Sequence, residues 1–338
     1  LIWKRRTSPG RAAGEVALLF AVAVGVVNLG MGGRGSLAPL GDQSFRSEFA
    51  RQVQSLLPEW TPMPLPRDYV LGFDAVKRDS EQGELGSYLF GRWTQRGVWY
   101  HDIVAFAVKT PLPLLAMLAV CPFALRRCLL SGRLARGELP WVLAPLVTLG
   151  FGLIFVNQVK IGVRYLLPLE PLLWLVTASL WTFTGATAAR STRAAAAAVL
   201  AWYAACVWSV HPNYLSFFNL AAGGAANGQR FLVGSDLDWG QDLYRLPAEL
   251  AARGHTGPIW LHYFGHVDPA LYGIEYQLLP DFPVRGLVAV SVSFLAQQSY
   301  PVTAPTGERV ARGWARLGWL GERTPVARLG TIWLYDTR

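Results

Sequence analysis

The 338-residue chain is 52% hydrophobic and only 16% charged, and its 31 Lys and Arg against 22 Asp and Glu residues give a net charge of +9. Charged residues make up about a quarter of an ordinary soluble domain, so this composition favours a membrane protein. The basic residues form no stripe interleaved with aromatic residues, which argues against nucleic-acid binding. The three cysteines show no metal-ligand spacing, and we expect neither a metal nor a cofactor.

Apolar stretches of near-membrane length recur along the first two thirds of the chain. A spanning helix needs roughly 17–25 residues, and the candidates are 12–31, 103–125, 139–157, 165–186 and 194–210. Lys and Arg precede the first stretch, and arginines lie between the second and third stretches and between the fourth and fifth. This excess of basic residues predicts that these three segments are cytoplasmic. The chain begins at Leu1 rather than Met, and we expect that it lacks an N-terminal part.

These patterns predict the fold class and the location of the protein. We expect a polytopic α-helical membrane protein with about five transmembrane helices and a C-terminal external α/β domain. The transmembrane region covers 1–210, with an external loop at 32–102, and the external domain covers 211–338. The protein is then integral to the plasma (inner) membrane, in contact with the lipid bilayer, and its C-terminal domain lies outside the cytoplasm.

Two sites in this region carry cations where the charge rule does not expect them. Lys160 and Arg164 lie in a short external connection, with Tyr165 directly after them. They either extend to lipid headgroups or bind a phosphate, for which the planar guanidinium of arginine is well suited. Lys109 lies inside the second apolar stretch, just before Thr110 and Pro111. It is either an intramembrane functional residue or an interfacial lysine, if the helix begins near the proline.

Residues 211–338 have the pattern of an α/β domain. Short apolar runs predict strands at 231–234, 259–264, 287–294 and 326–335, and leucines at helical spacing predict a helix over 241–253. Strand, helix and strand in this order favour an open sheet with a right-handed crossover. In such sheets ligands bind beyond the carboxyl ends of the strands. The loop between the first strand and the helix is therefore a candidate site.

That loop packs three carboxylates, a tryptophan and a glutamine around one glycine. It contains Asp236, Asp238, Trp239, Gln241 and Asp242. The carboxylates could cap the following helix. They could also bind a metal, although the spacing lacks the glutamate that closes a calcium loop. As a third possibility, carboxylates and amide bind the hydroxyl groups of a sugar or an acceptor while the tryptophan stacks on a ring.

Several segments together resemble a known enzyme family. They are 88–100, which ends in Trp99-Tyr100, Lys109 to Pro113, Gly162 to Pro168, His211 to Asn219, and Ser235 to Asp242. As a set they resemble bacterial phospholipid-carrier-dependent glycosyltransferases of the protein mannosyltransferase-like GT-C type. The resemblance covers roughly residues 65–275. Nothing in the chain matches the acidic first external loop that carries the catalytic carboxylate of this family, so the chain resembles a C-terminal portion and its catalytic residues are unknown.

The resemblance implies transfer of a sugar from a polyprenyl-phosphate carrier to an unidentified acceptor on the external membrane face. Lys160, Arg164 and Tyr165 would then hold the donor phosphate, and the 235–242 loop would shape the cleft for sugar or acceptor. The alternative is a non-catalytic membrane-anchored protein that binds a glycan or a partner. A transporter is a weaker third possibility, since the sequence shows no inverted repeat.

Overall fold

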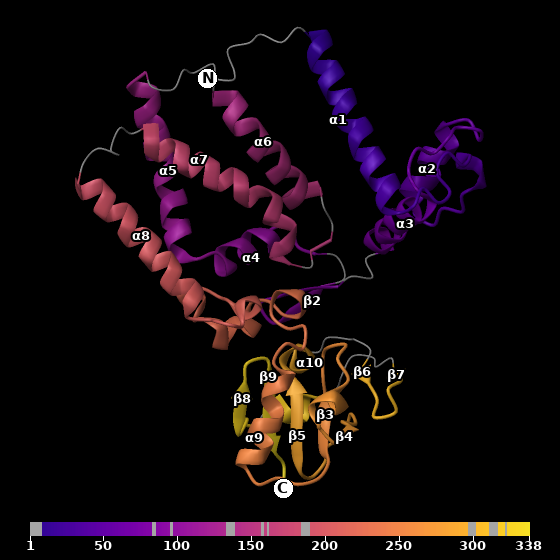
Figure 1. Ribbon diagram of the computed structural model, residues 1–338. Helices are drawn as coiled ribbons and strands as arrows, with labels where there is room; N and C mark the ends of the chain where they lie inside the picture. The colour runs from indigo at the N-terminus through magenta and orange to yellow at the C-terminus, as the bar shows by residue number, and fades with distance from the viewer. Residues whose placement is uncertain are drawn as a thin grey trace. The chain divides into compact units, whose positions relative to one another are not determined.

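The structure of the chain is a computed structural model, and it describes residues 9–82, 86–94, 97–132, 139–156, 159–160, 162–183, 190–296, 302–310, 317–321 and 323–338. The chain divides into two compact units, Leu1–Leu85 and Gly86–Arg338. Figure 1 shows the helices and strands of both units, which are described separately.

The first unit contains three α-helices, α1 (Pro9–Gly30), α2 (Glu48–Leu56) and α3 (Arg67–Gln82). Helix α2 begins after Ser47, whose hydroxyl accepts a hydrogen bond from the backbone N–H of Ala50. Two carboxylates of α3 bind the same end of α2. Asp74, which is buried, accepts the backbone N–H and the hydroxyl of Ser47, and Glu81 accepts the backbone N–H of Glu48. Two carboxylates along α3 thus bind the N-terminal end of α2.

The second unit begins with a short hairpin, β1 (Ser87–Leu89) and β2 (Arg92–Thr94), and continues with helices. Helix α4 (His101–Lys109) and helix α5 (Leu112–Leu130) meet at Thr110 and Pro111. Helix α6 (Leu139–Phe151) runs into a π-helix at Gly152–Val156, and a 3₁₀ helix at Val163–Leu169 leads into α7 (Glu170–Phe183). Helix α8 (Arg190–Trp208) follows, and α5 packs against both α7 and α8.

The prediction of a polytopic membrane protein with five spans is wrong. Within the described residues, a single helix is long and apolar enough to cross a membrane, Ala13–Gly30 of α1, or two if α4 and α5 count as one broken span. Those two helices are bent by 116° where Pro111 lacks the N–H that would continue the helix. The apolar parts of α6 and α8 are shorter, Leu143–Phe155 and Arg193–Trp208. The molecule is a mixed structure of helices and sheet.

The C-terminal part of the second unit contains a five-stranded mixed sheet of order β4-β3-β5-β9-β8. Its strands are β3 (Ile259–His262), β4 (Tyr276–Leu278), β5 (Leu287–Ser291), β8 (Ala327–Leu329) and β9 (Ile332–Asp336). Strand β3 pairs in parallel with β4 and β5, while β9 pairs antiparallel with β5 and β8. The remaining elements are α9 (Leu246–Ala252), α10 (Val292–Leu295), α11 (Gly318–Gly321) and the two-stranded ladder of β6 (Val302–Thr303) and β7 (Arg309–Val310).

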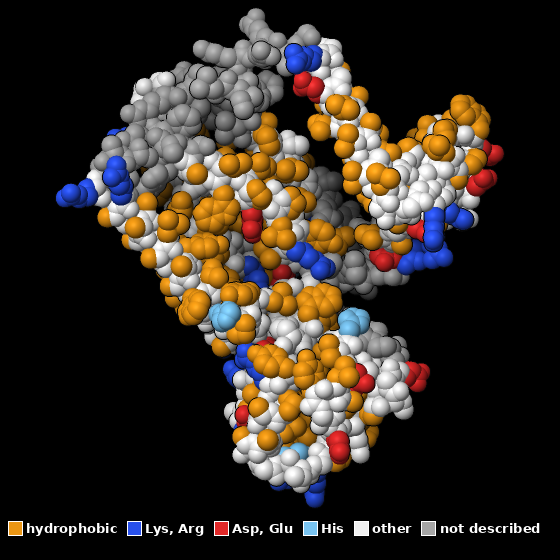
Figure 2. Space-filling model, in the orientation of Figure 1, with side chains coloured by type: hydrophobic (Ala, Val, Ile, Leu, Met, Phe, Trp, Pro, Cys, Tyr) orange, Lys and Arg blue, Asp and Glu red, His pale blue; other side chains and the backbone are white. Residues whose placement is uncertain are grey.

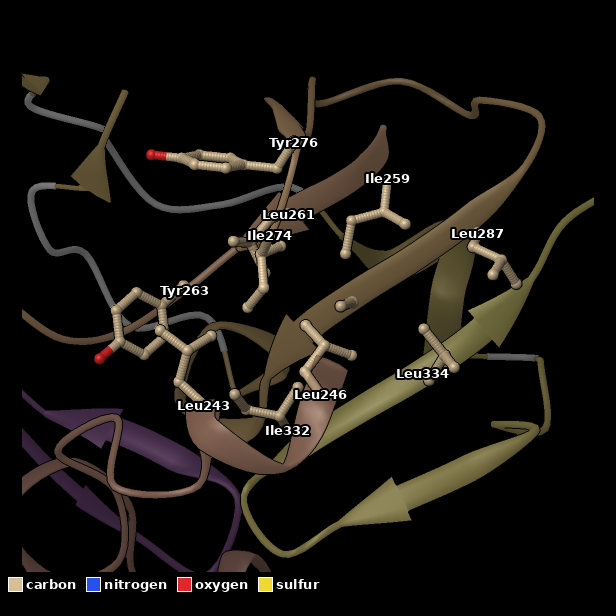
Figure 3. Packing of buried hydrophobic residues seen from close by; sticks show 11 residues of the cluster. Leu243, Leu246, Ile259, Leu261, Tyr263, Ile274, Tyr276, Leu287, Ile332 and Leu334 are labelled. Carbon is tan, nitrogen blue, oxygen red and sulfur yellow. The ribbon is translucent and has the colours of Figure 1, made fainter. Parts of the chain in front are cut away.

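Both faces of this sheet are covered by apolar side chains. On one face, Leu243 and Leu246, at the start of α9, pack against Leu261, Ile332 and Leu334 of the strands (Figure 3). On the other face, Phe294 and Leu320 pack against Val288 and Val290 of β5. The five residues of β5 are all buried, as expected of a central strand that is covered on both faces.

Three of the elements predicted for this part differ in the structure, and one of them, the strand predicted at 326–335, is two antiparallel strands, β8 and β9. Residues 231–233 are a turn, and a 3₁₀ helix at Gly234–Asp236 follows, so the predicted strand at 231–234 is wrong. This run is apolar because Leu232 and Val233 are buried against Leu89 and Val108 rather than in the sheet. The predicted helix over 241–253 is shortened to a 3₁₀ turn at Leu243–Arg245 and α9, which begins next to Pro247.

Candidate functional site

Three segments that are distant in the sequence meet in the second unit. They are helix α4, the described residues of 159–165 (159–160 and 162–165), and the 3₁₀ turn at Gly234–Asp236 with the loop that follows it. Lys109, Lys160, Arg164 and Asp236 lie on these segments. In Figure 2, Lys and Arg atoms lie beside Asp and Glu atoms between the helices and the sheet of this unit.

Lys109 is held by two backbone carbonyls and an aromatic ring. Its Nζ donates to the carbonyl oxygens of Leu215 at 2.7 Å and Asp236 at 2.5 Å, and it lies 4.3 Å from the centre of the Phe218 ring. Burial lowers the pKa of Lys109 from 10.5 to about 8, and the carboxylate of Asp236 partly opposes this change. The side chain is therefore roughly nine-tenths protonated at pH 7. Among the described residues, its hydrogen-bond acceptors take up two of the three ammonium protons.

Lys160 is also buried, but its ammonium group is fully occupied. It donates to Asp102 Oδ2 at 2.5 Å, to the carbonyl of Leu153 at 3.1 Å and to that of Ile154 at 2.7 Å. The two carbonyls belong to the π-helix at Gly152–Val156, where the ladder of hydrogen bonds is locally altered. Asp102 also contacts His101 Nδ1 at 3.2 Å. Lys160 thus fixes the π-helix to the start of α4.

Asp236 joins the 159–165 segment to the loop. Its Oδ1 accepts the backbone N–H of Val163 at 2.9 Å, directly after Gly162. Gly162 has φ +143°, and a methyl group there would lie 2.7 Å from Asp236 Oδ1, so this approach requires glycine. Burial raises the pKa of Asp236, while the Val163 N–H, Lys109, His101 and Arg164 counteract the effect.

Arg164 and Tyr165 lie at the outer side of this cluster. Arg164 is exposed, and its guanidinium lies 5.8 Å from the centre of the half-buried Tyr165 ring. The structure therefore separates the two cations of this segment. Lys160 is enclosed in an ion pair, whereas Arg164 is open to solvent and able to meet an anionic ligand.

The carboxylates of the polar loop point into the protein. Asp238 accepts the N–H of Gly240 at 2.9 Å and the hydroxyl of Ser293 at 3.2 Å, and burial raises its pKa from 3.8 to about 7. Asp242 accepts both the N–H and the hydroxyl of Thr331, at 2.9 and 3.1 Å. These contacts join the loop to the segment after β5 and to the turn before β9.

The other polar residues of the loop complete this arrangement. The Gln241 amide donates to the Leu237 carbonyl at 2.9 Å and to the Ser216 hydroxyl at 3.1 Å, and its oxygen accepts the Trp239 N–H at 2.7 Å. The Trp239 side chain is 42% exposed and its ring lies 5.8 Å from that of Phe264. Of the loop residues proposed to bind a sugar, Trp239 is the one that presents its side chain to solvent.

A cavity of about 220 Å³ lies beside Lys109. Its charged lining residues are Lys109 and Glu170, the first residue of α7. Burial raises the pKa of Glu170. The other lining residues are mostly apolar or aromatic. They come from the α4–α5 junction and α5, from the start of the 3₁₀ helix at Val163–Leu169, from α7 and α8, and from the segment that follows α8: Thr110, Pro111, Leu114, Val163, Trp174, Tyr203, Val207, Val210, Tyr214 and Phe217.

The sequence pointed to Lys109 but not to the residues that surround it. Glu170 lies inside the apolar stretch predicted at 165–186, and most residues that line the cavity with it come from other elements. His101 and Asp102 come directly before the apolar stretch predicted at 103–125. An aspartate next to a histidine at the start of an apolar helix is a pattern from which this buried polar pair could have been identified in the sequence. Among the described residues, no cluster of three or more His, Cys, Asp and Glu side chains could hold a metal ion.

Comparisons of the chain with protein-family models, with curated proteins and with solved structures give no match. The chemistry of the cavity is therefore the basis on which a function is proposed.

Proposed function

We propose that the chain is part of a glycosyltransferase that uses a polyprenyl-phosphate sugar donor, and that the cavity beside Lys109 holds the donor at its phosphate. The observation that carries this proposal is a largely protonated amine on the wall of an otherwise mostly apolar and aromatic cavity. A polyprenyl-phosphate sugar matches such a site, because it combines an anion, a sugar ring and an apolar chain.

The proposed contacts follow from the groups that remain available. Lys109 has one ammonium proton beyond the two that bind carbonyl oxygens among the described residues. Beside mostly apolar and aromatic walls, a charge-assisted hydrogen bond to phosphate is stronger than at a fully exposed surface. Glu170 is the acidic residue of the cavity lining and accepts a hydrogen bond from a sugar hydroxyl. Trp174 and Tyr203, whose rings meet edge to face at 5.6 Å, form an aromatic wall.

This arrangement stabilises the charge that develops during transfer. The acceptor oxygen attacks C1 of the sugar, the bond between C1 and the phosphate oxygen breaks, and the phosphate keeps the electron pair. The acceptor proton passes to a carboxylate base. A fixed ammonium group beside the departing phosphate stabilises the added negative charge without reorganising water.

A lipid-linked donor requires contact with a membrane, and two features support it. The Ala13–Gly30 segment of α1 has the length and composition of a spanning helix. In the second unit, large apolar side chains are exposed on α5, α6, α7 and α8, including Phe123, Val147, Leu175 and Leu200 (Figure 2). We propose that the chain is located at the plasma membrane, with residues 211–338 outside the cytoplasm.

A second candidate function is binding without catalysis. Asp236, Asp238 and Asp242 are all buried, and the chain's own N–H and O–H groups bind each of them. They are thus poorly placed to act as the base for an acceptor hydroxyl. A protein that binds a glycan or a partner needs the same cavity but no such base. The two functions differ in whether a bound sugar is transferred.

Binding of polyprenyl phosphate to the full chain in detergent, followed by tryptophan fluorescence, tests the proposal. Lys109→Gln is expected to weaken binding by about tenfold or more, the loss of one charge-assisted hydrogen bond. Lys77→Gln is the matched control, because Lys77 lies on α3 and makes an i,i+4 pair with Glu81. Equal affinity of the Lys109→Gln variant and the unchanged chain would contradict the phosphate site. Binding without sugar transfer to any acceptor would favour the second function.

A further inference from the structure

A larger cavity, of about 330 Å³, lies on the other side of the segment that follows α8. Its walls come from the segment that follows α8, the 3₁₀ helix at Ala225–Arg230, the loop and turn that precede α9, the start of α10, and the β8–β9 hairpin. This volume lies within the range of small-molecule sites, about 300–1,000 Å³. The lining residues that carry the argument are Asn213, Gln229, Arg245, Arg328, Thr331 and Trp333.

The lining contains two arginines and no carboxylate among the described residues. Arg328 is exposed, and in the described part of the chain it makes no ion pair. Arg245 contacts Asp242 and the Tyr244 hydroxyl through Nε, at 3.2 and 3.1 Å. Its terminal nitrogens have no hydrogen-bond partner among the described residues. Two guanidinium groups thus face the cavity, with one buried carboxylate nearby.

Asp242 forms an ion pair with Arg245 and positions this wall, while Arg328 has no ion-pair partner among the described residues. Its two oxygens accept the Asn213 amide at 3.0 and 2.9 Å, and Oδ2 also accepts the N–H and the hydroxyl of Thr331. A methyl group at Gly330 would lie 2.2 Å from Asp242 Oδ2, so the hairpin turn closes directly on the carboxylate. The carboxylate is 1% exposed, and a ligand would meet the groups around it.

The remaining lining groups are suited to a ring that carries hydroxyls. The Arg328 guanidinium lies 4.3 Å from the centre of the Trp333 ring, and this stacked pair forms a flat surface on one side. Gln229 supplies an amide to the lining, while the Asn213 amide and the Thr331 hydroxyl donate to Asp242 and complete the wall. Flat aromatic surfaces together with amides and hydroxyls are the groups that bind sugar rings, whereas guanidinium pairs bind phosphate and carboxylate.

We propose that this cavity is a second ligand site, and that it binds an anionic sugar, meaning a sugar ring that bears a phosphate or a carboxylate. The anion lies between Arg245 and Arg328, and the ring lies against Trp333. This site is separate from the Lys109 cavity and stands whether or not that cavity binds a lipid-linked donor.

Calorimetric titration of the full chain in detergent tests this site with four probes: glucose 1-phosphate, glucuronate, glucose and inorganic phosphate. Glucose 1-phosphate or glucuronate is expected to bind more tightly than either glucose or inorganic phosphate. Arg328→Gln is expected to weaken that binding by about tenfold or more. Arg285→Gln is the matched control, because Arg285 is exposed and lies ahead of β5, away from the cavity lining.

Other outcomes overturn the proposal. No heat with either anionic sugar, or binding that Arg328→Gln leaves unchanged, excludes the site. If inorganic phosphate binds as tightly as glucose 1-phosphate, the site does not recognise the sugar ring. Because Arg328 is exposed and unpaired among the described residues, its variant is expected to fold. Arg245→Lys gives a second test, since it keeps the charge beside Asp242 but removes the planar fork. Lys109→Gln is expected to leave this binding unchanged, which separates the two cavities.

Discussion

Replacing Lys109 with methionine tests the buried amine directly. Methionine fills a similar volume without a charge, so it removes the proton equilibrium of this position. The pKa of Lys109 is about 8 in the folded chain, against 10.5 for the unfolded chain. Between these two pH values the unfolded chain binds more protons than the folded chain. The free energy of unfolding therefore rises with pH across this window, and burial of the charge costs most below pH 8.

The size of the effect follows from the difference in pKa. A shift from 10.5 to about 8 corresponds to about 3 kcal/mol at roughly 1.4 kcal/mol per unit. The side chain is enclosed by the Leu215 and Asp236 carbonyls and by Phe218, so solvent screening reduces this figure little. The unchanged chain is expected to gain about 3 kcal/mol between pH 8 and pH 10.5 relative to the methionine variant.

Denaturant unfolding of the full chain in detergent, at several pH values in this window, measures the difference. Lys77→Met is the control, since Lys77 is paired with Glu81 on α3 and is only half-buried. Its pH profile is expected to follow that of the unchanged chain. If the Lys109→Met profile also follows the unchanged chain, the amine is not held in a low-dielectric environment. The argument for a desolvated phosphate site would then fail.

Three further predictions concern the polar loop and its contacts, and each is read out by denaturant unfolding unless stated otherwise. The pKa of Asp238 is raised from 3.8 to about 7 in the folded chain, so the folded chain binds more protons in this window and stability falls as pH rises through it. Asp238→Asn is expected to remove this loss of stability, which is about 4 kcal/mol. If the variant and the unchanged chain have the same dependence of unfolding free energy on pH, the raised pKa of Asp238 is refuted. Gly162→Ala is expected to lower the free energy of unfolding by at least about 1 kcal/mol, because φ is +143° and the methyl group would meet Asp236 Oδ1. A free energy of unfolding equal to that of the unchanged chain would contradict this contact. Asp242→Ala is expected to lower the free energy of unfolding by about 3–5 kcal/mol and to speed hydrogen exchange at the Thr331 amide. Protection of that amide equal to the unchanged chain would show that the hairpin turn does not depend on the carboxylate.

The positions of the candidate residues were more predictable than the architecture around them. Cations inside or beside apolar stretches are costly to bury, so Lys109, Lys160 and Arg164 stand out in the sequence without any knowledge of the fold. The structure places Lys109 and Lys160 in one buried polar cluster, with Arg164 at its outer side. Which cation is internally paired depends on Asp102, and the sequence does not show that contact.

The prediction of five spans failed for a physical reason, although the first stretch does form the long apolar helix α1. Apolar composition shows that a segment avoids water, but not that it continues as one straight helix. Pro111 breaks the second stretch, a π-helix ends the third, and a 3₁₀ helix containing Pro168 begins the fourth. The apolar run at 231–234 likewise joins a buried cluster without entering the sheet. The other predicted strand regions overlap β3, β5, β8 and β9, because their alternating or continuous apolar pattern depends on a sheet.

The central claim is that the cavity beside Lys109 holds a polyprenyl phosphate. The most direct measurement is photocrosslinking of the full chain with a polyprenyl phosphate that carries a photoreactive group next to the phosphate, followed by peptide mapping. The predicted result is labelling concentrated in Glu170, Trp174 and residues 203–217. This labelling is lost in the Lys109→Gln variant but kept in the Lys77→Gln variant. Labelling spread over the exposed apolar faces of α5 to α8, and unchanged in Lys109→Gln, would contradict it.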